Sequence, residues 1–151
     1  MRGPVPIVVT PQLSMNAAYW GLGTKAIYVA SDLTQLLEPE ELHAIILHER
    51  AHRELWHVEI NLFLSALTVL WSIGVGVKYG WLAALVVFVA LRALHAVYKI
   101  AQEAQADRWA AQVTPKLVEA FKKIRPNVRS RLHGALLDLR IRTAGTWAQK
   151  I

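Results

Sequence analysis

The sequence contains no cysteine, which excludes disulfide bonds and metal sites built from thiolates. Charged residues are also scarce, at 19% of the 151 residues, whereas hydrophobic residues make up 54%. This composition is too apolar for a disordered chain or a nucleic-acid-binding tail. A chain of this length ordinarily forms one domain, so we expect a single domain over residues 1–151. The apolar content and the formal charge of +6 together suit a basic soluble part attached to a membrane-embedded part.

Internal repeats and low-complexity segments are absent as well. A secretory signal is not expected, because Arg2 is followed by prolines and the apolar run Ile7–Val9 is too short to form the core of one. Residues 1–37 instead have the pattern of short strands and turns. Ile7–Thr10 and Ala26–Ala30 are the expected strands, with a glycine-containing loop between them.

A long helix is expected to begin at Glu38–Glu41. This segment places a proline and acidic side chains at a helix N-terminus, where they suit the backbone geometry and the helix dipole. Another helix is expected to run through Gln112, after an apolar stretch over residues 58–98. The expected fold class is therefore mainly α with a small β-sheet (α+β).

The first long helix carries His48-Glu49-Arg50-Ala51-His52, an HExxH motif. Residues four apart lie on one helix face, so His48 and His52 can bind a single ion through their imidazoles. Such donors are typical of catalytic zinc. Glu49 lies one position round the helix and is placed to act as the base on a metal-bound water, which predicts hydrolysis. The alternative is that both histidines are ordinary helix residues without a metal.

A third ligand has to come from another part of the chain, and Glu103 is the candidate. Glu103 and Asp107 are four residues apart and share a helix face. One carboxylate can then bind the metal while the other accepts a hydrogen bond from a ligand imidazole. Taken alone, the pair could equally solvate a helix surface and pair with Lys99 or Arg108. Beside an HExxH motif, the metal-binding interpretation is favoured.

The order of these motifs resembles the membrane gluzincin metalloproteases, the family of the heat-shock protease HtpX and the CAAX prenyl proteases. The resemblance covers about residues 5–110. It is carried by the following parts of the chain: Ile7–Val9, Asn16-Ala17, Gly21, Ile27–Val29, Glu40–Leu42, His48–His52, residues 58–98 and Glu103–Asp107.

This resemblance implies a minimal gluzincin-type zinc peptidase domain with an inserted hydrophobic helical hairpin, acting on a polypeptide substrate. One zinc ion per chain is expected on His48, His52 and Glu103, with Glu49 as the general base and Asp107 as the hydrogen-bond partner of a ligand. Asn16, Ala17 and the strand near Tyr28 are implied to frame a cleft in which an extended peptide adds as a strand.

The resemblance is weakest near the C-terminus. The family's late His-Pro…Arg-Ile element has two partial counterparts, which leaves Arg131 and Arg140 as alternatives for an arginine that organises the site or contacts the transition state. The pair of membrane helices that precedes the site in the HtpX branch has no counterpart.

Residues 58–98 are the expected membrane hairpin. Ile60–Val77 is free of charge over 18 residues, which is just long enough for a transmembrane helix. The second span is weaker, because Arg92 follows only 13 uncharged residues. A hairpin packed as a core or as a dimer interface is the alternative. The expected location is integral to the cell membrane, with the site on the cytoplasmic side.

Residues 116–151 form a basic region that contains nine lysines and arginines but only two acidic residues. Anionic lipid headgroups are the expected partners of this region, and nucleic acid is an unlikely one because no recognised nucleic-acid motif accompanies the charge. The region could also fold over the cleft and keep the enzyme latent. Two function classes follow: a zinc endopeptidase, and a latent or non-catalytic zinc-binding relative. The sequence indicates no oligomeric state.

Overall fold

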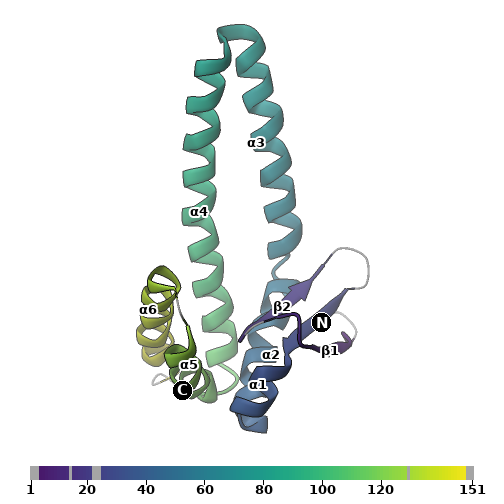
Figure 1. Ribbon diagram of the computed structural model, residues 1–151, viewed down its shortest axis with the longest axis vertical. Coiled ribbons are helices and arrows are strands. Elements are labelled where there is room, and N and C mark those ends of the chain that lie inside the picture. The colour runs from purple at the N-terminus through teal and green to yellow at the C-terminus, as the bar shows by residue number, and fades with distance from the viewer. Residues whose placement is uncertain (1–3, 14, 22–24, 129, 149–151) are drawn as a thin grey trace. The chain divides into compact units, whose positions relative to one another are not determined.

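The computed structural model describes residues 4–13, 15–21, 25–128 and 130–148. The chain divides into two compact units. Residues 1–55 and 104–151 form the first unit, and residues 56–103 form the second, which we call the hairpin unit. Figure 1 labels the helices and strands of both.

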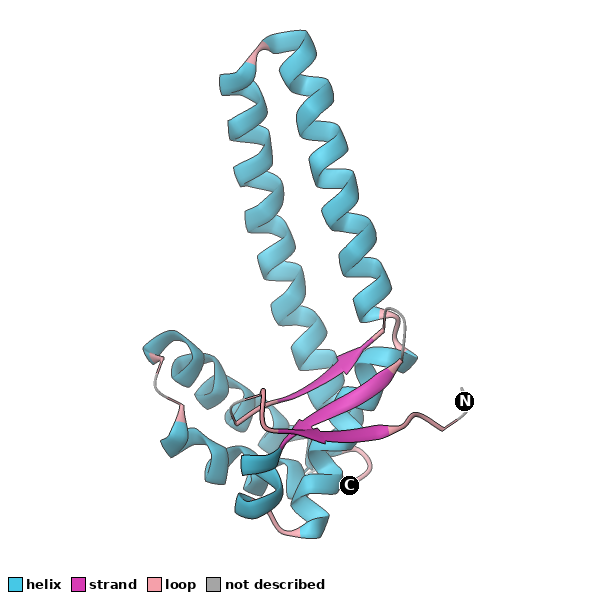
Figure 2. Ribbon diagram, turned by 45° about the vertical axis from the view of Figure 1, so that its right-hand side comes forward, coloured by secondary structure: helices cyan, strands magenta, loops and turns pink. Residues whose placement is uncertain are grey.

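A three-stranded sheet lies in the first unit (Figure 2). Its strands are β1 (Ile7–Thr10), β2 (Ala17–Trp20) and β3 (Ala26–Ala30), in the order β1-β3-β2. Strands β1 and β3 run parallel, whereas β2 and β3 are antiparallel. The two expected strands are therefore confirmed, and β2 is an additional strand that the sequence did not indicate.

The central position of β3 corrects one prediction. Its backbone pairs on one side with β1 and on the other with β2, where Ala18 lies opposite Tyr28. Because both sides of a strand must carry its ladder bonds, no peptide can add to β3. The prediction of strand addition at Ala26–Ala30 is wrong, and β2 and β1 are the edge strands.

Helix α1 (Ser31–Leu36) leads into α2 (Pro39–Glu54), which carries the HExxH motif. A capping box begins α2: the Glu38 side chain accepts from the backbone of Glu41, and the backbone N–H of Glu38 donates to Glu41 Oε2 at 2.9 Å. Lys123 Nζ lies 2.8 Å from the same buried carboxylate. Burial by itself raises the pKa of Glu41, but the hydrogen bonds from Lys123 and the Glu38 backbone and the positive charges of Lys123 and Lys116 together hold that pKa below its usual value.

The ion pair between Lys123 and Glu41 joins α2 to the C-terminal part of the first unit. That part consists of α5 (Lys116–Ile124), a 3-10 turn η1 (Arg125–Asn127) and α6 (Arg131–Ala148). The predicted basic region is thus mainly helical over its described residues, and several of its charges are paired within the protein, as in Arg125–Asp138 at 2.7 Å. Small and aliphatic side chains that are fully buried let α2 and α5 pack closely: Ala44, Ala51, Leu117 and Ala120.

The hairpin unit contains α3 (His57–Tyr79) and most of α4 (Trp81–Ala111). Gly80 joins the two helices with a φ of 91°, a conformation that side chains with a Cβ rarely adopt. Near this turn the helices approach so closely that a Cβ at Gly76 would lie 3.2 Å from Ala84 Cβ. A glycine at each of these positions therefore lets the chain reverse tightly.

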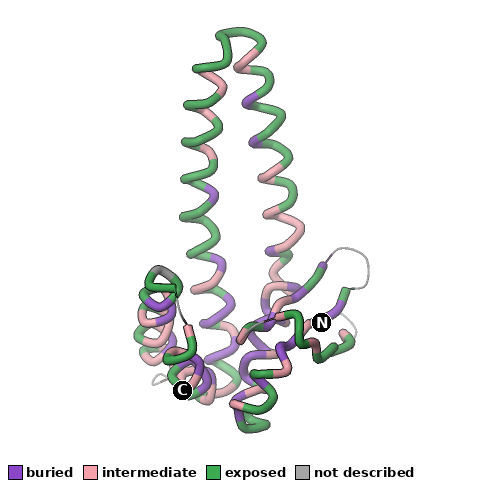
Figure 3. Tube along the Cα trace, viewed as in Figure 1, coloured by how far each residue is buried: buried purple, intermediate pink, exposed green. Residues whose placement is uncertain are grey.

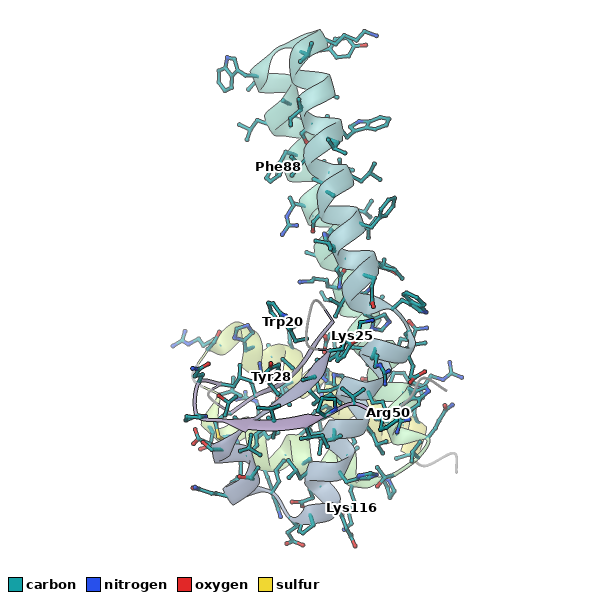
Figure 4. All side chains as sticks on the ribbon, turned by 90° about the vertical axis from the view of Figure 1, so that its right-hand side faces the viewer. Trp20, Lys25, Tyr28, Arg50, Phe88 and Lys116 are labelled. Carbon is teal, nitrogen blue, oxygen red and sulfur yellow. The ribbon has the colours of Figure 1, made fainter. Side chains whose placement is uncertain are left out.

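Most of the hairpin unit is exposed (Figure 3), and its exposed residues include many large apolar ones. Val77 is 86% exposed and Trp81 is 77% exposed, and Figure 4 shows the ring of Phe88 projecting away from the helices. By length and composition, α3 and α4 are both able to cross a membrane. The predicted fold class, mainly α with a small sheet and two long apolar helices, is confirmed. The single-domain prediction for residues 1–151 stays a prediction.

Candidate metal centre

The two histidines of the HExxH motif lie on one face of α2, as their spacing predicts. His48 is 4% exposed, and its Nε2 lies 3.1 Å from Nε2 of His52. The rings meet edge to face with centroids 4.8 Å apart. His48, His52 and Glu103 each offer a ligand atom, and these atoms lie within 4.8 Å of one another. The structure thus brings the three expected ligands together.

Asp107 lies one helical turn after Glu103 on α4 and is fully buried. Its Oδ1 is 2.9 Å from His48 Nδ1, which therefore carries the proton and donates it to the carboxylate. This hydrogen bond leaves Nε2 as the nitrogen with a lone pair for a metal. Asp107 is thus placed as the expected hydrogen-bond partner of a ligand imidazole.

Arg140 on α6 holds the other side of Asp107. Its Nε donates to Oδ2 and its Nη2 to Oδ1, both at 2.8 Å, which is a bidentate pair. Burial by itself raises the pKa of Asp107, but the hydrogen bonds from His48 and Arg140 outweigh it and keep that pKa below its usual value. Asp107, which lies outside the apolar segment 58–98, is therefore a stable carboxylate.

Of the two candidate arginines, Arg140 is the one whose side chain contacts Asp107 and His48. Arg140 Nη2 lies 3.1 Å from His48 Nε2, and its guanidinium stacks 4.5 Å from the ring centroid of Phe121. Phe121, on α5, also meets the His48 ring edge to face. Arg131 is the exposed first residue of α6. The structure places Arg140 at the site, and Phe121 is a further contact residue that the sequence did not indicate.

The carboxylate of Glu49 is held by a backbone group of the sheet. The N–H of Tyr19 on β2 donates to Glu49 Oε2 at 2.8 Å, and the side chain of Glu49 is largely buried. The other oxygen, Oε1, lies 3.9 Å from His48 Nε2. One end of the carboxylate is thus fixed by the sheet while the other faces the histidine pair.

Asn16 and Ala17 lie at the edge of the sheet. Ala30 N–H donates to the Asn16 carbonyl, so the peptide groups of Asn16 and Ala18 face β3. Because these groups alternate along a strand, those of Ala17 and Tyr19 point to the open side of β2. The side chain of Asn16 accepts a hydrogen bond from the Ala17 N–H at 3.0 Å.

Tyr28, the remaining expected substrate-binding residue, lies on the central strand. Its side chain is half-buried and its backbone faces β2. Figure 4 labels Tyr28 and Trp20 on the sheet, and Arg50 on α2. Tyr28 can therefore contribute to a substrate surface only through its side chain.

The donor set fits zinc. In a tetrahedral site with zinc–nitrogen bonds of about 2.0–2.1 Å, two ligand nitrogens lie roughly 3.3 Å apart. The Nε2 atoms of His48 and His52 are 3.1 Å apart. Two imidazoles and one carboxylate are also the usual ligands of catalytic zinc.

Two histidines, a distant carboxylate and a separate glutamate on a helical domain with a small sheet are the features of a metallopeptidase. The model of peptidase family M48 matches residues 2–132. The chain therefore belongs to peptidase family M48, and the resemblance to the HtpX and CAAX-type metalloproteases is confirmed. No curated protein and no solved structure matches the chain.

Replacing Asp107 by Asn tests the support of His48. The change keeps the shape but removes the charge, and it sets an amide N–H group against Arg140. We expect zinc affinity to fall by about 10- to 100-fold, measured by competition with a chromogenic chelator. Asp138→Asn is the matched control, because it breaks an arginine–aspartate pair on the surface of the same unit. An Asp107→Asn protein with unchanged zinc affinity would contradict this role.

Proposed function

We propose that this chain is a zinc-dependent endopeptidase that hydrolyses peptide bonds in extended polypeptide segments. The observation that carries the proposal is the position of Glu49. Its carboxylate lies beside the cluster of His48, His52 and Glu103 and is held by the amide of an edge strand. A purely structural metal site has no use for a carboxylate anchored in this way, so the geometry favours hydrolysis over a non-catalytic role.

A zinc ion bound at this cluster supplies Lewis acidity, which makes water more acidic and polarises a carbonyl group. Glu49 accepts the proton from the attacking water at Oε1, the oxygen nearer to the histidines, and returns it to the leaving amine nitrogen. The bond from Tyr19 N–H to Oε2 keeps the carboxylate in one orientation throughout. Burial keeps competing water away from this proton transfer.

The remaining residues of the site keep the ligands in place. Asp107 fixes the His48 ring with Nδ1 protonated and Nε2 directed to the metal. Arg140 fixes Asp107 and stacks on Phe121, so that α5 and α6 both support the same ligand. The C-terminal helices are therefore assigned to holding the site rather than to covering it.

The open side of β2 is the proposed substrate site. The carbonyl groups of Ala17 and Tyr19 point outward there and can accept hydrogen bonds from the amides of an extended peptide. Tyr19 also binds Glu49, so a peptide on this edge lies next to the base. Asn16 stands at the start of the edge, where its side chain covers the Ala17 amide.

The hairpin unit is proposed to cross the membrane, with membrane lipid as its partner. Its exposed surface is almost entirely apolar. Such a surface is unfavourable in water and favourable in the hydrocarbon core of a membrane. Arg50 and Arg53 precede the hairpin and Lys99 and Arg108 follow it, whereas Lys78 is the charge at the turn. This distribution favours a cytoplasmic location for both ends.

Glu49→Gln tests the mechanism. Glutamine keeps the shape of the side chain but cannot accept the proton, so we expect zinc to stay bound while turnover falls by about two to four orders of magnitude. Peptide cleavage and zinc content are measured on the same preparation. Glu54→Gln is the control, because Glu54 lies on the same helix but pairs with Arg50. Cleavage at the wild-type rate by the Glu49→Gln protein would sink the mechanism.

Backbone methylation of a cleaved peptide tests strand addition to β2. A single N-methyl group two or three residues before the cleaved bond removes one donor to the edge. We expect KM to rise about tenfold, the loss of one hydrogen bond. The same group at a distant terminal residue is the control. If every methylated peptide keeps the original KM, the peptide does not pair with this edge.

Membrane fractionation tests the location. We expect the full chain to stay in the membrane through an alkaline carbonate wash, because extraction would expose two apolar helices to water. A cysteine introduced at Tyr79 should then react only with a reagent that reaches the outer side. Release into the wash, or labelling from the cytoplasmic side alone, would refute this topology and leave the zinc assignment intact.

A further inference from the structure

A polar cluster interrupts the apolar hairpin unit on the side where α3 begins, with one half-buried and two buried residues. Asn61 of α3 bonds to two residues of α4: its Nδ2 donates to Gln102 Oε1 at 2.8 Å, and its Oδ1 lies 2.8 Å from His95 Nε2. His95 is 6% exposed and Gln102 is 3% exposed. Because Asn61 Oδ1 can only accept, His95 carries its proton on Nε2 and donates it. We call these three residues the amide clamp.

The clamp fixes the rotation of α4 against α3. His95 and Gln102 are seven residues apart, close to two full helical turns, so they lie on one face of α4. Asn61 holds both, one through each end of its amide. Arg92, a turn before His95 on the same face, lies 3.4 Å from His95 Nδ1 through its Nη1. A rotation of α4 would break both bonds of Asn61 at once.

Near the turn, the two helices meet through small and apolar side chains. The contact near the turn is between Gly76 and the methyl group of Ala84, and the surrounding lining is almost entirely apolar. Apolar contacts of this kind tolerate small rotations, whereas buried hydrogen bonds in an apolar setting lose their partners when the helix turns. The clamp therefore helps to set how α4 is rotated against α3.

Glu103 follows Gln102 directly on this helix, about 100° further round. Holding Gln102 against α3 thus determines the direction in which the Glu103 side chain leaves the helix. We propose that Asn61 is a positioning residue for the zinc site: through Gln102 and His95 it directs Glu103 toward the metal. This inference rests on the proposed function, in which Glu103 is the third ligand.

Asn61→Leu in the full chain, purified in detergent, is the test. Leucine is similar in volume but forms neither bond, so we expect the zinc dissociation constant to rise about tenfold. Thr68→Val is the matched control: Thr68 is also buried on α3, but its hydroxyl bonds to Leu64 of its own helix. Thr68→Val should leave zinc affinity unchanged.

A double-mutant cycle with Glu103→Ala separates positioning from general destabilisation. Without the Glu103 carboxylate, Asn61→Leu should have no further effect on zinc affinity. The exchange Asn61→Gln with Gln102→Asn swaps the long and short amides, and it should recover affinity that either single change loses.

An equal loss of affinity in the wild-type and Glu103→Ala backgrounds would overturn the positioning role, since the effect would not pass through Glu103. Unchanged affinity in Asn61→Leu would overturn it as well. If Glu103→Ala itself leaves zinc affinity unchanged, Glu103 is not a ligand and the proposed site fails at that residue. The two failures are therefore distinguishable.

Discussion

The buried carboxylate of Asp107 is the constraint on which the metal centre depends. A fully buried charge is costly unless it is paired and hydrogen-bonded. Asp107 meets this requirement with His48 on α2 and Arg140 on α6, so one side chain of α4 joins three helices that are far apart in the sequence. The pairing also determines the protonation of His48 and hence which nitrogen can bind a metal. The contacts that pair the buried Asp107 within the first unit therefore also orient His48.

Helix α4 combines two environments in one continuous element. Its first part carries exposed apolar side chains, whereas its last turns carry Glu103, Asp107 and the fully buried Ala106 and Ala110. Side-chain directions along a helix differ by about 100° per residue, so Gln102 and Glu103 leave α4 on adjacent parts of its surface. The proposed amide clamp acts on α4 directly before Glu103.

Much of this arrangement can be predicted from local sequence signals. The HExxH helix follows from its acidic, proline-containing start and its helical spacing, and two strands follow from β-branched runs. Strand β2 could not be predicted, because Ala17–Trp20 has no β-branched residue and is extended only through pairing with β3. Strand order depends on contacts distant in sequence. The sequence alone therefore does not show that β3 is the central strand, which cannot accept a further peptide. The choice of Arg140 over Arg131 could have been predicted from helical spacing. Arg140 lies three residues after Leu137 and four before Ala144, the two apolar residues that are buried on the packed face of α6.

The register of β2 links the proposed peptide site to the proposed base. Ala18 lies opposite Tyr28, which turns the amide of Tyr19 outward to meet Glu49. Because peptide groups alternate along a strand, a shift by one residue would turn this amide toward β3 and leave the carboxylate without it. The same shift would move the carbonyl groups that face an incoming peptide. In the proposed function, a substrate paired with this edge and the carboxylate that takes the proton are positioned by one set of backbone bonds, so the register of the sheet would determine which residue is cut.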